Sequence, residues 1–167
     1  MSNQDTKESL VETLRGVHVL HDISDEHLEQ IAVFTQCWSI PANTVIFHEG
    51  EEGECIYLVD RGNVVLEVQV PGGGNKRICT VGAGELLGWS PVLGETRMTA
   101  TARTIDETRA CGIDAKQVLA FCEHNPRFGY EFMRRTALAV IKRLTATRLQ
   151  LLDVYRHDLP TAHGEGE

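Results

Sequence analysis

The spacing of apolar residues changes twice along the chain, from a helical period to alternation and back again. Residues 6–15 and 24–34 carry apolar side chains three or four positions apart, which predicts two amphipathic helices. In the second segment Ser24 suits the N-cap position, and Leu28 and Ile31 lie on one face. Both helices are therefore expected to pack against the rest of the protein.

Residues 37–114 show the pattern of short strands instead. Glycine, proline and asparagine interrupt the alternation every eight to twelve residues, a cadence typical of a sandwich or barrel. Residues 64–70 and 77–81 flank a glycine-rich turn at 71–75, which predicts a hairpin with one buried face. The three consecutive glycines of that turn join two strands and open no helix, so we do not interpret them as a phosphate loop.

The helical period returns after Asp114, a residue suited to cap a helix. Residues 115–124 predict a short helix that stops at an Asn-Pro pair, and residues 128–155 predict a long one. Apolar residues form two rows on the long helix: a first row of Met133, Ala137, Ile141, Leu144, Leu151 and Tyr155, and a second row of Leu138, Leu149 and Leu152. Either this helix lies within its own core, or one row packs inward while the other pairs with a second subunit. We favour the second arrangement and expect a homodimer through the C-terminal helix.

These patterns together predict a mainly β protein, a jelly-roll-like β-roll flanked by N-terminal helices and a long C-terminal helix. We assign residues 1–160 to a single domain, with helices within 6–34, the β-roll at 37–114 and C-terminal helices at 115–156. The polar, glycine-containing residues 161–167 are expected to form a flexible tail.

Composition and charge narrow the classes of function. The 42% hydrophobic and 24% charged fractions are ordinary globular values, and no apolar run reaches the length of a membrane span. A net charge of −8 opposes a nucleic-acid or anionic-membrane partner, although residues 127–156 hold seven basic and two acidic side chains. These basic residues lack interleaved aromatic residues and are expected to form a mostly solvated face. We expect a soluble, cytoplasmic protein that does not bind nucleic acid directly.

The spacing of cysteine and histidine argues against metal chemistry. The five cysteines, at positions 37, 55, 79, 111 and 122, contain no CxxC pair, and the seven histidines contain no HxH or HExxH spacing. We therefore predict no metal site, no catalytic centre and no disulfide framework. The cysteines are expected to serve as small apolar side chains in a reducing compartment.

The most informative stretch is residues 82–102, with the sequence GAGELLGWSPVLGETRMTATA. Gly88 permits a left-handed turn, Ser90 can cap a helix, and Pro91 suits the first helical position, so a short helix is predicted there. The unpaired N–H groups of such a helix attract phosphate, and the Arg97 guanidinium can bind a phosphate bidentately. The alternative is that Arg97 only forms a salt bridge with a neighbouring glutamate.

In these features the sequence resembles the cyclic nucleotide-binding domain family, which includes the effector domains of catabolite activator protein-type regulators. The resemblance covers residues 10–156 and rests on the order of the elements and on the glycine-punctuated segment 40–64. It rests also on the sequence GELLG at 84–88, which matches the approach to the phosphate-binding cassette of the family. The resemblance implies the β-roll fold, a regulatory and non-enzymatic role, no cofactor, and cyclic AMP or cyclic GMP as the ligands to test.

The resemblance also implies an altered ligand site. In the family, a glutamate after the cassette glycine accepts hydrogen bonds from the ribose, and an arginine about eight to ten residues later holds the cyclic phosphate. Arg97 matches the arginine, but Trp89 stands in place of the glutamate, and an indole cannot act as a carboxylate acceptor. Thr147 falls where some relatives place side chains near the base. The alternative for Thr147 is an exposed threonine on a solvated helix.

Three hypotheses for function follow. The first is a stand-alone regulatory domain that senses a cyclic nucleotide or a related small anion, with no DNA-binding domain expected because little sequence follows residue 160. The second is a degenerate, ligand-free domain that serves as a dimeric protein-interaction module, and the third is a small metal-dependent β-roll enzyme. For the first hypothesis, the candidate ligand-binding residues are Gly88, Trp89, Ser90, Arg97, Met98, Thr99 and Thr147.

Overall fold

Two helices open the chain and pack against each other. The computed structural model describes the backbone of residues 3–158 and the side chains of residues 8–149. Helix α1 spans Asn3–Arg15 and helix α2 spans Asp25–Ala32, which confirms both predicted helices with small changes at their ends. The Ser24 hydroxyl accepts a hydrogen bond from a backbone N–H of the first turn of α2 at 3.4 Å, which confirms the N-cap.

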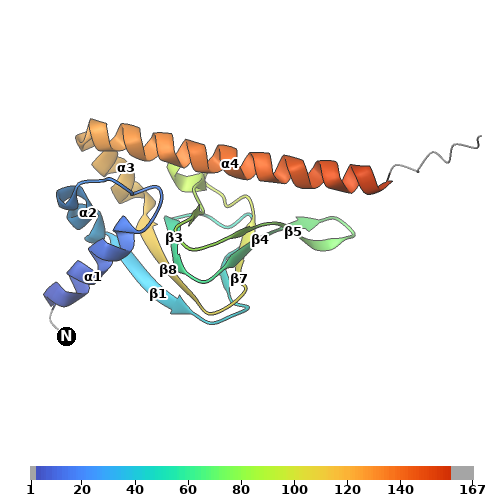
Figure 1. The fold of residues 1–167 in the computed structure, drawn as a ribbon, viewed down its shortest axis with the longest axis horizontal. Coiled ribbons are helices and arrows are strands. Elements are labelled where there is room, and N and C mark those ends of the chain that lie inside the picture. Colours follow the sequence, from blue (N-terminus) through green and yellow to red (C-terminus); the bar gives the residue numbers. More distant parts are fainter. Residues whose placement is uncertain (1–2, 159–167) are drawn as a thin grey trace, which may run out of the picture.

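Within residues 3–158, eight strands form two antiparallel four-stranded sheets that build a β-roll (Figure 1). One sheet has the order β1-β8-β3-β6 and the other the order β2-β7-β4-β5. The strands are β1 (Thr35–Ile40), β2 (Val45–Phe47), β3 (Cys55–Arg61), β4 (Val64–Val70), β5 (Gly74–Val81), β6 (Leu86–Leu87), β7 (Thr101–Thr104) and β8 (Thr108–Asp114). This arrangement confirms the predicted mainly β, jelly-roll-like fold between N-terminal helices and a long C-terminal helix.

The predicted hairpin is formed by β4 and β5, which pair antiparallel over most of their length. Its burial differs from simple alternation, because Val64, Val65 and Leu66 are all buried whereas Val70, near the turn, is 37% exposed. The register shifts between Leu66 and Glu67, which leaves Ile78 on β5 as the extra residue of a β-bulge. The base of the hairpin is thus covered on both faces, while its tip projects beyond the roll (Figure 1).

The protein has one apolar cluster between the two sheets and another outside them. The cluster between the sheets, which we call the inner core, contains Phe47, Val59, Val64, Leu66, Val81, Leu87, Met98, Ala100 and Ala102. The outer core joins the helices to the outward-facing side chains of the first sheet. Strand β6 marks the division, because successive strand side chains point to opposite faces: Leu86 belongs to the outer core and Leu87 to the inner core.

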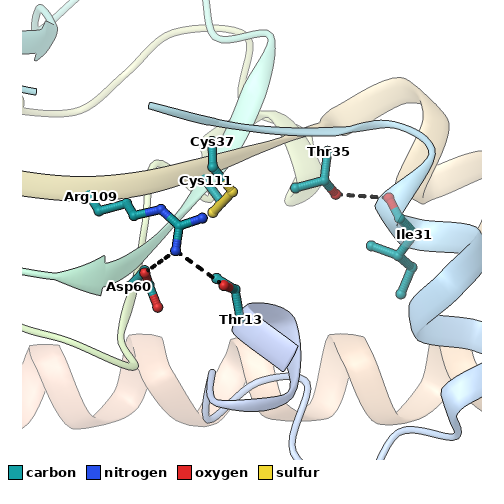
Figure 2. Close-up of a disulfide and its surroundings, with 7 residues drawn as sticks. All are labelled: Thr13, Ile31, Thr35, Cys37, Asp60, Arg109 and Cys111. Atoms are coloured by element: carbon teal, nitrogen blue, oxygen red, sulfur yellow. Dashed lines mark hydrogen bonds and ion pairs between the residues drawn. A yellow bond between two sulfur atoms is a disulfide. The ribbon is translucent and has the colours of Figure 1, made fainter. Parts of the chain in front are cut away.

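A disulfide joins Cys37 on β1 to Cys111 on β8, the first and last strands of the roll (Figure 2). The two residues lie directly opposite each other in the β1–β8 register. The expectation that all cysteines are free thiols is therefore wrong, because residues 74 positions apart become neighbours only through strand pairing. Cys55, Cys79 and Cys122 are free, and burial raises the pKa of each thiol above its ordinary value.

Two helices follow the roll, α3 (Ala115–His124) and α4 (Pro126–Asp158). The Asp114 carboxylate caps α3 by accepting the Gln117 N–H at 2.8 Å, as predicted. Helix α4 crosses the roll and extends past it on the side of the β4–β5 hairpin (Figure 1). None of the helices described between residues 3 and 158 is long and apolar enough to cross a membrane.

The two apolar rows of α4 do not divide into an inward and an outward row. At the start of the helix, Phe128 and Phe132 are buried and Met133 packs partly on the outer core. Beyond that point both rows are exposed, with exposed fractions of 51% for Leu138, 57% for Ile141, 49% for Leu144 and 59% for Leu149. The prediction of one inward row is therefore wrong after Met133. The remaining members of the rows, at 151, 152 and 155, and the predicted tail at 161–167 lie outside the described side chains.

Candidate ligand-binding cassette

The cassette begins at Gly88, where the chain leaves β6. The φ angle of Gly88 is +67°, in the left-handed region that the sequence predicts. A Cβ atom at this position would lie 3.1 Å from the Tyr57 ring, 3.2 Å from the Phe47 ring and 3.4 Å from the Met98 methyl carbon. Glycine is therefore required both by the backbone conformation and by the close approach of the inner core.

The predicted short helix after the cassette glycine is a single 3₁₀ turn, η1 (Ser90–Val92). Trp89 holds the N-cap position without a side-chain capping bond, while Ser90 lies within the turn and is 4% exposed. The N–H groups of Val92 and Leu93 both donate to the Trp89 carbonyl, at 3.0 and 3.1 Å. The prediction of a helix capped by Ser90 is wrong, and a turn this short lacks the row of aligned N–H groups on which the anion site was based.

The Trp89 side chain lies between the cassette and α4. It packs against the outer core, and the guanidinium carbon of Arg143 is 4.3 Å from the centroid of its ring. A cation over an indole face is attracted by the quadrupole of the ring. Trp89 therefore connects the cassette to the long helix.

Arg143 is the site residue that the sequence analysis missed, because it was assigned to a solvated basic face. Its guanidinium donates to the Leu86 carbonyl at 2.9 Å in addition to covering Trp89. Burial lowers the pKa of Arg143, against the opposite effect of the nearby Glu85 carboxylate. A signal was available, since Arg143 lies one helical turn before Thr147, the α4 residue to which the family resemblance points.

An ion pair lies next to this contact. The Lys142 ammonium is 3.1 Å from one carboxylate oxygen of Glu85, and the other oxygen accepts the Gly82 N–H at 2.9 Å. Burial alone would raise the pKa of Glu85, but the hydrogen bonds from Gly82 and Lys142 outweigh it and lower the pKa. Glu85 is therefore ionised at neutral pH and offsets part of the positive charge of Lys142 and Arg143.

Arg97 lies at the surface, near the end of the cassette. Its guanidinium donates to the Gly50 carbonyl at 2.6 Å, and its backbone forms an isolated bridge with Glu52. Among the side chains that the structure describes, no carboxylate lies within ion-pair distance of Arg97, so the alternative of a salt bridge to a glutamate is not supported. Among the described side chains and backbone groups, the Arg97 guanidinium therefore has a neutral carbonyl as its partner, and it is exposed to solvent.

The neighbours of Arg97 alternate between solvent and the interior of the roll. Met98 is 3% exposed and belongs to the inner core, whereas Thr99 is exposed. Met98, and not Arg97, therefore points into the roll. On α4, the Thr147 hydroxyl donates to the Arg143 carbonyl at 3.0 Å, a bond within its own helix.

The inner side of the cassette is covered by apolar side chains. The rings of Phe47 and Tyr57 lie 5.5 Å apart, and both approach Gly88 together with Met98. Burial is the main cause that raises the pKa of Tyr57 to about 12, so its hydroxyl is neutral at physiological pH. None of these side chains carries a positive charge. A phosphate placed beside them would therefore lose its solvation without a positively charged side chain to compensate for that loss.

The described residues also bear on the metal-dependent enzyme hypothesis. No group of three or more histidine, cysteine, aspartate or glutamate residues that could hold a metal ion is present within the described part of the chain. Residues 8–149 therefore offer no candidate ligand set for that hypothesis.

The order of N-terminal helices, β-roll, glycine-initiated cassette and long helix defines one class of protein, the cyclic nucleotide-binding domain. The family model of the cyclic nucleotide-binding domain matches residues 37–125, more than half of the chain. This chain therefore belongs to the cyclic nucleotide-binding domain family.

Several known proteins share this fold. The cyclic AMP receptor protein of Thermus thermophilus is 25% identical over 138 residues, which are 83% of this chain and 62% of that protein. A putative cyclic nucleotide-binding protein from Geobacter metallireducens superposes with a TM-score of 0.71 at 28% identity, over 80% of this chain and 96% of that one. A cyclic nucleotide-binding domain from Methylobacillus flagellatus superposes with a TM-score of 0.76 at 19% identity, over 95% and 87% of the two chains, which shows the fold alone. The chain spans less than two thirds of the length of the Thermus relative.

Proposed function

We propose that this chain is a non-enzymatic regulatory domain that senses a small anionic ligand and responds through the contact between its cassette and α4. The observation that carries the proposal is the stacking of Arg143 on Trp89, which joins the two elements through a cation. An anion that reaches Arg143 competes with the indole and with the Leu86 carbonyl for the same guanidinium. Ligand binding would thereby loosen the contact between the cassette and the long helix.

A cyclic nucleotide held in the usual mode of the family is disfavoured as that ligand. Trp89 replaces the ribose acceptor and is engaged with α4, and Met98 covers the inner side of the cassette. Arg97 is directed to the Gly50 carbonyl at the surface. We expect cyclic AMP and cyclic GMP to bind weakly, with Arg97 as the anchor for any phosphate that does bind at the cassette itself.

A thermal-shift panel followed by calorimetric titration tests the proposal. The panel contains cyclic AMP, cyclic GMP, phosphate monoesters and carboxylates, and at least one non-cyclic anion should stabilise the wild-type protein. Arg143→Met should reduce that effect, whereas Lys116→Gln, which removes a positive charge from α3, should not. An inert panel would reject anion sensing.

Cyclic AMP provides the opposite test. Tight binding that Arg97→Ala weakens by about tens- to hundredfold, the value of a charge-assisted bidentate contact, would show that the cassette works in the usual mode. That result would mean that Trp89 and Met98 do not close the cassette to a cyclic nucleotide.

A dimeric protein-interaction module is the second candidate function. It is favoured by the exposed members of the two apolar rows of α4, Leu138, Ile141, Leu144 and Leu149. Exposed apolar side chains at helical spacing form a patch that pairing with a second copy would remove from water. The double variant Ile141→Lys/Leu144→Lys should lower the molecular mass measured by light scattering from dimer to monomer. Thr145→Lys adds a positive charge at an exposed polar position of the same helix and should leave the dimer intact. A monomeric wild-type protein would contradict this candidate.

A further inference from the structure

A cavity lies in the seam between the roll and α4. Its volume is about 370 Å³, and its lining comes from the segment after α1, from the region of β5 and β6, and from α4. Glu85 and Leu86 line it from the roll, and Leu138, Lys142 and Ala146 line it from the helix. Because Leu86 belongs to the outer core, this seam cavity lies outside the roll and is separate from the inner core.

The seam cavity concentrates positive charge in an acidic protein. Arg135, Lys142 and Arg143 line it together with one carboxylate, that of Glu85, in a chain whose net charge is −8. His18 lines the cavity on the side of the segment after α1. Such a local excess of positive charge favours an anionic ligand.

Two of these cations have charge available for a ligand. Among the described side chains, no carboxylate forms an ion pair with Arg143, whose partners are the Leu86 carbonyl and the Trp89 ring. The Lys142 side chain is 76% exposed, so its ammonium can turn from Glu85 towards a ligand at small cost. The charge of Arg135 is less available, because its guanidinium donates to backbone carbonyls of the segment after α1 and forms an ion pair with Glu131.

The rest of the lining is mostly apolar, and its apolar members are Val19, Leu86, Leu138, Ala139 and Ala146. A water molecule occupies about 30 Å³, so a cavity of about 370 Å³ has room for about a dozen groups of that size. An inorganic anion would leave most of this apolar surface in contact with water. A ligand that fits both parts needs a charged head and an apolar body.

We propose that the seam cavity binds a small amphipathic anion, a phosphate monoester or carboxylate that carries a short alkyl body. The head group would lie between Lys142 and Arg143, and the body would pack against Leu86, Leu138 and Ala139. This inference rests on the proposed function and names the site and the chemical class of its ligand. Because Arg143 also stacks on Trp89, such a ligand would act on the contact that joins the cassette to α4.

Calorimetric titration with octyl phosphate, below the concentration at which it forms micelles, tests the ligand class. Inorganic phosphate and octan-1-ol serve as the two halves of the probe, and octanoate tests whether a carboxylate head suffices. Octyl phosphate should bind at least tenfold more tightly than either half, because each buried methylene contributes about a fourfold gain in affinity. Equal affinity for inorganic phosphate alone would overturn the amphipathic class.

Matched variants on α4 test the location. Lys142→Gln should weaken octyl phosphate binding about five- to tenfold, whereas Arg148→Gln, an equal charge change outside the lining, should leave it unchanged. Ala146→Phe should abolish binding by filling the cavity, and Ala137→Phe, at an exposed position outside the lining, should not. Glu85→Gln should strengthen binding several-fold, because it removes the carboxylate that competes for Lys142.

The outcomes separate this inference from the proposed function. If octyl phosphate binds but Lys142→Gln and Ala146→Phe do not affect it, the anion binds elsewhere and the seam site is wrong, while anion sensing stands. If no anion binds, both proposals fail. Sedimentation with phosphatidylglycerol vesicles, without binding of soluble octyl phosphate, would identify a membrane surface as the partner and overturn the small-molecule site.

Discussion

The contact between Trp89 and Arg143 should stabilise the protein by a measurable amount. The guanidinium carbon lies 4.3 Å from the ring centroid, and both side chains are partly buried. Cation–π contacts contribute about 0.5–1 kcal/mol at exposed sites and about 2 kcal/mol when desolvated. Partial burial places this contact between the two limits, so we expect a coupling of about 1 kcal/mol between the two side chains.

A double-mutant cycle isolates this coupling from the other effects of each change. Arg143→Met also removes the bond to the Leu86 carbonyl and the cost of burying a charge, and Trp89→Leu also removes apolar contact area. These effects cancel when the double variant is compared with the two single variants. Urea unfolding followed by far-ultraviolet circular dichroism, at one protein concentration, gives the four free energies.

The second tryptophan supplies the control. Trp38 lies on β1, where its ring packs over Gly112, and Trp38→Leu should show no coupling with Arg143→Met. A coupling of Trp89 with Arg143 within about 0.3 kcal/mol of zero, the usual error of additivity, would refute the idea that this stack holds the cassette to α4.

Three further predictions concern the framework of the site. Alkylation without reductant should detect three free thiols. Reduction of the Cys37–Cys111 disulfide should lower the free energy of unfolding by about 4 kcal/mol in the chain-entropy model. An unchanged urea midpoint after reduction would contradict a stabilising disulfide. Gly88→Ala should lower the urea midpoint more than Gly94→Ala does, because both have a positive φ but only Gly88 meets side-chain atoms within 3.4 Å; equal losses would argue against the close approach. The pKa of Glu85 is lowered in the folded protein, so its ionised carboxylate stabilises the fold fully above the ordinary pKa of 4.5, and this contribution is lost as the pH falls through the folded-state pKa. The difference in unfolding free energy between wild type and Glu85→Gln should therefore shrink below pH 4.5. A difference that stays constant with pH would count against the Gly82 and Lys142 bonds.

The sequence was sufficient to predict those parts of the fold that depend on short-range patterns. The Ser24 and Asp114 caps each lie next to the helix they begin, and the two strands of the hairpin at 64–81 are neighbours along the chain. Gly88 was predicted to have a left-handed conformation because few residues other than glycine adopt it readily. The family resemblance supported these local predictions by fixing their order.

Features that depend on long-range contacts were missed. The Cys37–Cys111 disulfide requires the register of β1 against β8, which the spacing of cysteines cannot reveal. The direction of Trp89 and the burial of Arg143 depend on how α4 crosses the roll, and a helix with apolar residues on several faces does not indicate which face turns inward. The length of η1 was also missed, because Ser90 and Pro91 suit the start of a 3₁₀ turn as well as that of an α-helix.

The bond between Cys37 and Cys111 also has a mechanical consequence, because it closes the strands of the roll into a covalent ring with a pair of helices attached at each end. A force that pulls the two ends of the chain apart passes from β1 to β8 through the sulfur atoms and bypasses the residues between them. The helices would then be unravelled under load while the strands inside the ring carry no tension. Because the bond spans 74 positions, the oxidised protein should extend about 250 Å less than the reduced protein when it is fully stretched.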